Sequence, residues 1–580
     1  MIDYLGKFLN ILHSARYYKP SQLKWYFYYR VRNFLPISLW FSPNVPLEIQ
    51  IEERKKESLR RYAKLWAEHI SLKKEEIDSI LEGRVKFAGE EFCLNESLEG
   101  TKVKISPLAS YELHSFDFIW KLCIYYFQSF DERIEKFVKD CIVRWIELNP
   151  PGTPVSWDPY PTSFRIRYVL TAYSIWGWND EQILHSVWLQ LQYLTRSLEL
   201  HLLGNHILQN LCGALVGAEV VSPEFKENLL KTLCIELEEQ ILEDGGHYER
   251  VPMYHFHVLC DLLWLLAVLD PMPLFIKETV IKMLKFGEGI TLSDGNYPLF
   301  GDSVYEHLPR CEEILHVGYK LTGIVPQTNI PKKALKDFPH SGYYLFKCQT
   351  VGKRDIEMVI KGGEPGPYFQ LAHAHSDQLS YELLVDGKRF VVDSGVDGYA
   401  GSKYRLFQRS SKAHNIIWID GVDQLEAWGT FRVARRGRCE VEEVKTEPLF
   451  RFVGRYYYYT GERIKRTVEL NYPFLSIKDE VMCRPDRRFV YNFVHFHPNV
   501  NVVLEDSGNN CIIATGYGIQ VNLDIIGTDS VELVKGLRDY SQGWYSERFG
   551  YTVPNNVVVM LKRNTEHSKV LMFEYKFRFE

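Results

Sequence analysis

Histidines and carboxylates able to bind a metal ion gather in the second half of the chain. The segment His373-Ala-His375-Ser-Asp377 is followed by Asp393, which ends the run RFVVD, and by His414, which opens HNIIWID. Alternate residues of an extended segment face the same side, so His373 and His375 are expected to point together. Imidazoles and carboxylates suit a divalent transition metal. The pattern fits a metal site, and it fits histidines in turns equally well.

Two polar groups lie at the predicted starts of apolar helices. Asn205 and His206 follow Gly204 directly before ILQNLCGALVG, and Tyr254 and His255 begin a later apolar run. An asparagine in this position is a common helix cap, and a tyrosine in an apolar helix more often packs than donates a proton. By themselves these residues indicate helix starts, with an acid–base pair as the alternative.

Aromatic and basic side chains suited to an acidic sugar occur in two segments. One is SWDPYPTSFRIR, and the other is the Tyr-rich loop after RFVVDSG. Arginine forks bind carboxylates in a bidentate manner, and aromatic faces stack on sugar rings. A helix start with a salt-bridged arginine is the alternative for the first segment. The candidates are Trp157, Tyr160 and Arg165 in the first segment and Tyr404 and Arg405 in the second.

The elements that must position these residues change type along the chain. Helical spacing of apolar residues predicts a mainly helical segment over 1–100 and repeated helices over 101–340, packed as antiparallel pairs in a toroid or a solenoid. The expected helices include 115–128, 131–148, 163–177, 181–200, 206–219, 224–242, 251–269 and 274–289. Residues 341–580 alternate in the manner of strands, with glycine, aspartate and asparagine turns, and predict an antiparallel β domain of stacked sheets. A multidomain α+β protein follows, with its ligand site expected at the junction.

Composition limits the classes of partner. The 580 residues carry a net charge of −5, so the chain has no general basic field and nucleic acid is not expected as a partner. Its 11 cysteines show no CxxC pair and read as reduced core residues. The N-terminus shows no secretion leader and no apolar run spans a bilayer, which together predict a cytoplasmic protein without a membrane partner.

Taken in order, the motifs Asn-His, MYH, HxHxD, DxG and AHN resemble those of the heparinase II/III-like polysaccharide lyases and the related alginate and oligoalginate lyases. The resemblance covers most of the chain, from the arm near residues 10–35 through the helical part to the β part. It implies an incomplete (α/α) toroid followed by an antiparallel β-sandwich. It also implies cleavage of uronic-acid-containing glycans by β-elimination, with an acidic poly- or oligosaccharide as the substrate.

The resemblance also assigns roles to single residues. Asn205 resembles the asparagine that neutralises the uronate carboxylate, and His206 the histidine beside it that assists binding or proton transfer. Tyr254 resembles the catalytic tyrosine that acts as general acid and in some members also as base. His373 resembles the histidine that joins the proton transfer. Tyr404 is similar in position to a loop tyrosine near the cleaved bond, with Tyr399 as the alternative.

The family's metal site supplies the remaining assignments. His375, Asp393 and His414 resemble the three ligands of one divalent metal, with zinc the first choice and manganese the second, in a structural role. The substrates that the resemblance implies are glycosaminoglycans, such as hyaluronan, chondroitin sulfate and heparan sulfate, or alginate.

Two other functions stay open at this point. The first is a non-catalytic or biosynthesis-associated glycan-binding protein of the same fold in an exopolysaccharide pathway. The second is a glycoside hydrolase, which needs a pair of carboxylates across the cleft. Asp158, Asp244 and Glu249 are candidates for such a pair, but none has an evident partner in the sequence.

Overall fold

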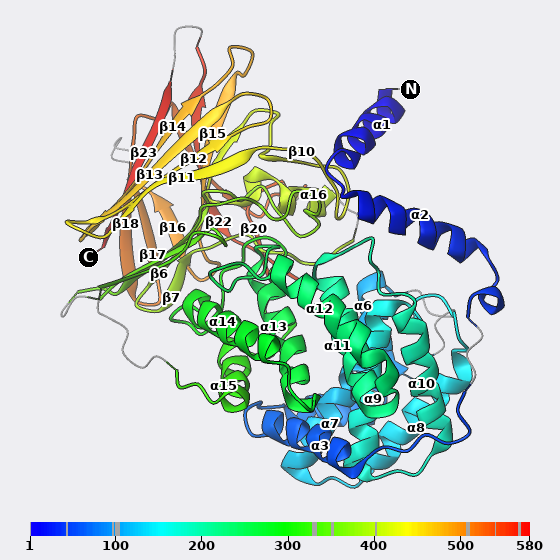
Figure 1. The fold of residues 1–580 in the computed structure, drawn as a ribbon. Coiled ribbons are helices and arrows are strands. Elements are labelled where there is room, and N and C mark those ends of the chain that lie inside the picture. The colour runs from blue at the N-terminus through cyan, green and yellow to red at the C-terminus, as the bar shows by residue number, and fades with distance from the viewer. Residues whose placement is uncertain are drawn as a thin grey trace.

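The structure is a computed structural model that describes residues 2–41, 45–94, 98, 105–326, 333–349, 353–400, 403–505, 511–539, 541–565 and 570–579. A helical part formed by the first half of the chain lies against a β part formed by the second half (Figure 1). The predicted order of a helical part followed by antiparallel sheets is therefore confirmed.

The N-terminal hundred residues divide into two unlike pieces. Helices α1 (Ile2–Ala15) and α2 (Pro20–Phe34) form an arm along the edge of the molecule, whereas α3 (Glu53–Ala67) packs into the helical part against α7 and α9 (Figure 1). After α4 (Lys74–Leu81), strands β1 (Arg84–Phe87) and β2 (Glu90–Cys93) form a hairpin in a segment predicted to be mainly helical. The turn depends on Gly89, whose φ of 82° favours glycine.

The helical part is built from consecutive helices that pack side by side. Pro159 and Pro252 occupy the first turns of α9 and α13, where proline's missing N–H is not needed. Helices α9 and α11 approach closely, because a Cβ on Gly213 would lie 2.4 Å from the Ser163 carbonyl oxygen. The helices are α6 (Pro107–Ser115), α7 (Asp117–Ser129), α8 (Arg133–Leu148), α9 (Pro159–Trp176), α10 (Glu181–Thr195), α11 (Gly204–Val221), α12 (Lys226–Gln240), α13 (Pro252–Val268), α14 (Leu274–Ile290) and α15 (Cys311–Thr322).

The β part is a sandwich whose core lies between antiparallel sheets. A five-stranded sheet runs in the order β3-β4-β5-β6-β7, and an eight-stranded sheet in the order β11-β12-β13-β14-β23-β18-β17-β16. Phe346 of β4 stacks on Phe450 of β12 with ring centroids 4.1 Å apart, which places the core between these two sheets. A four-stranded sheet, β19-β22-β15-β8, and two pairs, β9-β10 and β20-β21, complete the fold.

The strands of the two large sheets have the following bounds. In the five-stranded sheet they are β3 (Lys333–Phe338), β4 (Tyr343–Cys348), β5 (Ile356–Lys361), β6 (Tyr381–Val385) and β7 (Lys388–Val391). In the eight-stranded sheet they are β11 (Arg438–Lys445), β12 (Phe450–Tyr457), β13 (Arg463–Asn471), β14 (Phe474–Met482), β16 (Asn501–Leu504), β17 (Cys511–Gly516), β18 (Ile519–Ile526) and β23 (Leu571–Phe579).

The remaining strands of the β part form the smaller sheets. The strands are β8 (Ile417–Ile419), β9 (Leu425–Ala427), β10 (Val433–Arg436), β15 (Phe489–His495), β19 (Ser530–Lys535), β20 (Trp544–Arg548), β21 (Tyr551–Pro554) and β22 (Asn556–Arg563). A short helix, α16 (Lys403–Arg409), stands within the segment predicted to be a flexible loop. Its Arg405 and Arg409 are buried, so this segment takes part in the packing of the protein.

Direct bonds join the helical and β parts. The Tyr343 hydroxyl donates to the Arg250 carbonyl oxygen at 2.7 Å, and the Ser341 hydroxyl donates to Asp244 at 2.6 Å. Tyr343 and Leu345 belong to the same apolar cluster as the helices. The cysteines of the described residues form no disulfide. Within the described ranges, no helix has both the length and the apolar character needed to cross a membrane.

Candidate active site

The N-terminus of α11 presents an amide and an imidazole side by side. Glu249 accepts the backbone N–H of Asn205 at 2.9 Å and the Asn205 side-chain amide at 3.2 Å from both oxygens. Gly204 permits this approach, because a Cβ there would lie 2.1 Å from Glu249 Oε1, and its φ is +64°. Glu249 therefore holds the amide of Asn205 in one orientation.

His206 is paired with an acid and stays partly open. Its Nδ1 lies 3.1 Å from Glu199 Oε2, and its side chain is 27% exposed. Burial opposes the charged imidazole, yet the attraction and hydrogen bond of Glu199, with a smaller contribution from Glu249, raise the pKa of His206 above its ordinary value. The raised pKa favours a positive charge beside Asn205, which suits the binding of an anion.

Tyr160 of α9 links this pair to helix α13. Its ring centroid lies 4.7 Å from that of His206, and its hydroxyl is 3.2 Å from His257 Nε2. His257 in turn lies one helical turn after Tyr254 on α13, with ring centroids 6.3 Å apart. The tyrosine predicted to contact substrate therefore stands between the two helices that carry the predicted catalytic residues.

Tyr254 lies against the histidine from the β part. The Tyr254 and His373 rings stack with centroids 3.9 Å apart, and the Tyr254 hydroxyl is 3.0 Å from the Tyr399 hydroxyl. Burial raises the pKa of Tyr254 well above its ordinary value, and Tyr399 and Asp302 act in the same direction. The Tyr254 hydroxyl therefore stays protonated and is suited to donate a proton.

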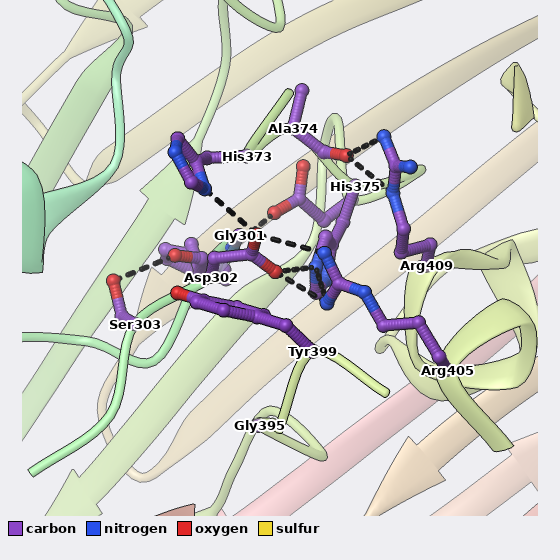
Figure 2. Close-up of polar contacts among 12 residues, drawn as sticks. Gly301, Asp302, Ser303, His373, Ala374, His375, Gly395, Tyr399, Arg405 and Arg409 are labelled. Carbon is purple, nitrogen blue, oxygen red and sulfur yellow. Dashed lines mark hydrogen bonds and ion pairs between the residues drawn. The ribbon is translucent and has the colours of Figure 1, made fainter. Parts of the chain in front are cut away.

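Asp302 is the buried carboxylate that joins these groups (Figure 2). Its Oδ2 lies 2.9 Å from His373 Nδ1, its Oδ1 lies 2.8 Å from His375 Nε2, and Arg405 binds both oxygens. Burial opposes ionisation, but Arg405 and the two histidines hold the pKa of Asp302 well below its ordinary range. With Nδ1 donating to this carboxylate, His373 keeps its Nε2 as a proton acceptor.

The loop that carries Asp302 is itself anchored on both parts. The Asp302 N–H donates to the His373 carbonyl oxygen at 3.1 Å, and the Gly301 N–H donates to Asp377 at 2.9 Å. The Ser303 hydroxyl accepts the N–H of Met253, next to Tyr254, at 3.3 Å. The loop between α14 and α15 thus fixes the helical tyrosine and the β-part histidine relative to each other.

Two of the predicted substrate contacts lie outside this cluster. Trp157 is 3% exposed and donates its indole N–H to the Asn149 carbonyl oxygen at 2.8 Å. Arg165 is fully buried, stacks over Trp145 at 3.9 Å and donates to the His114 carbonyl oxygen at 2.6 Å. Both side chains serve the core of the helical part, because their aromatic and guanidinium groups satisfy buried partners there.

The loop tyrosines are distinguished by their bonds. The Tyr404 hydroxyl lies 3.1 Å from Ser546 Oγ, whereas Tyr399 contacts Tyr254 directly. The position beside the predicted acid therefore belongs to Tyr399, the alternative in the sequence. The Arg405 guanidinium lies 5.2 Å from the centre of the Tyr399 ring, but it is 1% exposed and bound to Asp302. Arg405 therefore positions Asp302 and is not placed to contact substrate.

The three predicted metal ligands, His375, Asp393 and His414, lie close together, but Asp393 is hydrogen-bonded to His414. His414 Nδ1 lies 2.7 Å from Asp393 Oδ2, and the rings of His375 and His414 are 5.4 Å apart. Within the described residues, no group of three His, Cys, Asp or Glu side chains is arranged to hold a metal. Asp393 bonds to a histidine, as carboxylates around metal sites often do, and its role as a metal ligand stays a prediction.

The donor chemistry fits a metal in part. His375 Nδ1 and His414 Nε2 are buried atoms without a hydrogen-bond partner in the structure. Burial lowers the pKa of His375 to about 3, which keeps the imidazole neutral as a ligand must be. Two imidazoles alone fall short of the three or four protein ligands usual for zinc. The metal stays a prediction. The roles proposed for Asn205, His206, Tyr254 and His373 do not depend on it.

The sequence did not single out Asp302 or the position of Phe431. Asp302 lies in PLFGDSVY, where a carboxylate directly after an apolar run is the one signal that could have marked it. Phe431 lies 5.7 Å from His373 and 5.1 Å from Tyr399 by ring centroids, although its own segment shows no pattern. The sequence suggests Glu249 only as a hydrolase acid, whereas its bonds to Asn205 give it a positioning role.

Taken together, these side chains can bind a carboxylate and move a proton. Asn205 offers an amide donor and His206 an imidazole whose raised pKa favours a positive charge, while His373 can accept a proton and Tyr254 can donate one. The carboxylates that a hydrolase would need are engaged elsewhere. Asp158 accepts the Tyr111 hydroxyl at 2.7 Å, and Asp244 accepts Ser341.

Comparison with known families matches both halves of the chain. The family described as Heparinase II/III N-terminus matches residues 27–315, and the one described as Heparinase II/III-like, C-terminal, matches residues 330–571.

The chain is also similar to two heparin-sulfate lyases. A heparin-sulfate lyase of Pedobacter heparinus is 24% identical over 351 residues, which cover 53% of this chain and 52% of that protein. A heparin-sulfate lyase of Bacteroides stercoris is 26% identical over 255 residues, 39% of this chain and 37% of the relative. The chain thus matches about half or less of the length of these relatives.

Among solved structures, the crystal structure of a heparinase III shares the fold. It has a TM-score of 0.68 at 16% identity and covers 97% of this chain and 92% of its own. A mutant heparan sulfate lyase of Pedobacter heparinus has a TM-score of 0.58 at 18% identity, covering 91% of this chain and 88% of its own. These likenesses confirm the predicted fold of a helical toroid followed by a β-sandwich.

Proposed function

Because the chain belongs to the heparinase II/III family, we propose that it is a polysaccharide lyase that cleaves uronic-acid-containing glycans by β-elimination. One observation carries the proposal: a proton donor from the helical part, Tyr254, stacks at 3.9 Å on a proton acceptor from the β part, His373. β-Elimination needs such an acid–base pair next to a group that neutralises a carboxylate.

The proposed reaction uses each side chain once. The amide of Asn205 and the charged His206 bind the uronate carboxylate and stabilise the negative charge that develops when C5 loses its proton. His373 Nε2 accepts the C5 proton, and Asp302 balances the resulting charge on the imidazole. The electron pair forms the C4–C5 double bond as the C4–O bond breaks, and the Tyr254 hydroxyl protonates the leaving oxygen. To restore the site, His373 releases the C5 proton to solvent, and the Tyr399 hydroxyl, 3.0 Å from the Tyr254 hydroxyl, relays a solvent proton to Tyr254.

For the substrate we propose a glycosaminoglycan, with heparan sulfate first. The support is the name of the relatives, which are heparin-sulfate lyases. The cation His206 and the amide Asn205 suit any uronate, so hyaluronan, chondroitin sulfate and alginate belong in the same test.

The test is the near-ultraviolet absorbance of the 4,5-unsaturated uronate, measured on heparan sulfate, hyaluronan, chondroitin sulfate and alginate. We expect absorbance to rise on at least the heparan sulfate sample. New reducing ends without absorbance would identify a hydrolase instead. Binding of a glycan without any cleavage would support the non-catalytic alternative and overturn the proposal.

A further inference from the structure

The N-terminal arm turns its apolar side chains away from the protein. On α2, Phe27 is 64% exposed, Val31 63% and Phe34 82%. At about 100° per residue, these three and Leu23 fall within an arc of about 80°. The opposite side of the helix faces the protein and carries Arg32 among its buried residues. The amphipathic pattern of α2 is therefore reversed relative to a helix that packs on a core.

The contacts that hold α2 in place are polar or aromatic. Arg32 donates to the Arg196 carbonyl oxygen at 2.7 Å and to Ser197 Oγ at 3.0 Å. Its guanidinium lies 4.1 Å from the centre of the Trp40 ring. At the start of the helix, Lys19 forms an ion pair with Glu239 of α12. The apolar stripe takes no part in these attachments.

Helix α1 repeats the same reversal. Ser14, on its protein-facing side, donates to the Val433 carbonyl oxygen at 3.1 Å and accepts the Trp428 indole N–H at 3.0 Å. Phe8 and Leu12, on the other side, are 55% and 51% exposed. Both helices lie along the edge of the molecule, where α1 points away from the helical part (Figure 1). Exposed apolar side chains gathered on both helices in this way mark an interaction site.

Charge separates the arm from the rest of the chain. Residues 1–41 hold six lysines and arginines against a single aspartate, a net charge of +5, while the whole chain carries −5. The remainder therefore carries −10. An anionic surface attracts the arm and repels the body, which orients the molecule with the arm toward that surface.

We propose that α1 and α2 dock on an anionic lipid bilayer, with their apolar side chains among the acyl chains and their basic side chains among the headgroups. The apolar stripe of α2 is flanked by Arg30 and Tyr26 on one side and by Lys24 and Tyr28 on the other. Basic and aromatic residues on both flanks of an apolar stripe are typical of helices that lie in the plane of a membrane interface.

A second copy of the chain explains these observations less well. A protein groove would cover a stripe from one direction and would not require cations on both of its flanks. The proposal revises the prediction of no membrane partner, because the sequence does not show which face of α2 the protein covers. It is independent of the lyase function.

The test is flotation of the full chain with vesicles of phosphatidylcholine mixed with phosphatidylglycerol, compared with vesicles of phosphatidylcholine alone. We expect binding to the anionic vesicles that weakens as salt is raised. Removing one buried phenylalanine side chain costs about tenfold in partitioning, so the double variant Phe27→Ser/Phe34→Ser should lose about a hundredfold. Phe130→Ser, at a residue 67% exposed on the helical part, is the matched control and should bind like the wild type.

A charge-reversal variant tests the basic side chains of α2. The double variant Lys24→Glu/Arg30→Glu should lose the preference for anionic vesicles while its melting temperature stays unchanged, because both side chains are exposed. Equal binding by Phe27→Ser/Phe34→Ser and the wild type would overturn the proposal. Absence of vesicle binding would also overturn it. If sedimentation velocity then showed a dimer that Phe27→Ser/Phe34→Ser dissociates, a second copy of the chain would be the partner of the arm instead.

Discussion

Tyr254 differs from a free tyrosine mainly because it is buried. Burial raises the pKa of its hydroxyl well above the ordinary value, and the neighbouring Tyr399 and Asp302 strengthen that shift. A tyrosine that acts as a base needs its pKa lowered, whereas an acid needs its proton retained. We therefore propose Tyr254 as the acid and His373 as the base.

Removing the Tyr254 hydroxyl tests that assignment. We expect Tyr254→Phe to lower turnover by about 10²–10⁴-fold, the usual contribution of a general acid. Its melting temperature should change little, because a single hydrogen bond contributes about 1 kcal/mol. The measurement is kcat by absorbance together with calorimetry.

Tyr62→Phe is the matched control for that variant. Tyr62 is a buried tyrosine of the same helical part, packed on Trp264 at 4.5 Å between ring centroids, and its loss should leave turnover intact. Wild-type turnover in Tyr254→Phe would remove Tyr254 from the mechanism.

The pair Glu199–His206 makes stability and activity depend on pH. Burial opposes ionisation of Glu199, but His206 and the amide of Asn210 hold its pKa below the ordinary value, and the pKa of His206 is raised. The histidine's share of the stabilisation is complete below its unfolded pKa and disappears as pH rises through the raised value. The glutamate's share is present above its unfolded pKa and disappears as pH falls through the lowered value.

Glu199→Gln should therefore be least stable relative to the wild type between those two limits. In the same variant, the alkaline limb of kcat/KM should move to lower pH, because His206 loses the neighbour that keeps it charged. Melting temperatures and rates across pH measure both effects. Glu227→Gln, at an exposed helical pair with Lys231, should change neither. An unmoved alkaline limb would show that the charge on His206 is not needed.

The metal is a separate prediction at this scale. We expect elemental analysis of the purified chain to find one divalent ion, with zinc before manganese, because two neutral or neutralisable imidazoles lie buried with unpartnered nitrogens. His414→Ala should abolish that metal and lower the melting temperature. His340→Ala, at an exposed histidine, should do neither. Fully active protein free of metal would refute the prediction.

At the scale of elements, the loop between α14 and α15 decides whether the site assembles. Its Asp302 holds the segment that contains His373 and His375, and it holds α16 through Arg405. The bond from Met253 to Ser303 ties the same loop to α13. No single helix or sheet carries the acid–base pair, so the loop sets the distance between its two members.

Asp302→Asn should therefore cost both stability and activity. Breaking a buried ion pair leaves Arg405 without its counter-charge, which typically costs about 3–5 kcal/mol. Urea denaturation measures the free energy of unfolding, and hydrogen exchange should rise in segment 371–375 and in α16.

Glu306→Gln provides a control in the same loop. Glu306 also pairs with an arginine of the β part, Arg548, but the carboxylate is 68% exposed, so the loss should stay below about 1 kcal/mol. Equal losses of stability in Asp302→Asn and Glu306→Gln would contradict the proposal that Asp302 holds the site together.

At the scale of the whole molecule, the apolar cluster of the helical part extends into the β part, which also has a core of its own. Tyr343 and Leu345 of β4 lie in the apolar cluster built mainly by the helices, and the proposed cleft residues come from both parts. We expect calorimetry of the full chain to show a single cooperative transition, because neither part can lose its structure without exposing this shared surface. Two well-separated transitions would show that the parts are independent.

Much of the fold was determined by local sequence. Apolar spacing marked the helices from 115 to 289 and the alternating strands after 340, because burial on one face leaves a period that survives in the sequence. It missed the β1–β2 hairpin and α16, which are short and rest on neighbours distant in the chain. Phe549 and Gly550 lie against the hairpin turn at Gly89, which residues 84–93 alone cannot reveal.

The site shows the same division between sequence and tertiary structure. The sequence pointed to Asn205, His206, Tyr254 and His373 only through the resemblance that the order of their motifs carries, because each motif alone also fits a helix start or a turn. It could not tell Tyr399 from Tyr404 or a surface arginine from the buried Arg165, since a residue's type does not record which way its side chain points. The role of Asp302 is visible only in the tertiary structure, because its carboxylate bonds to His373, His375 and Arg405, each more than seventy residues away in the sequence. Only folding brings such charges close enough for each to set the protonation of the others.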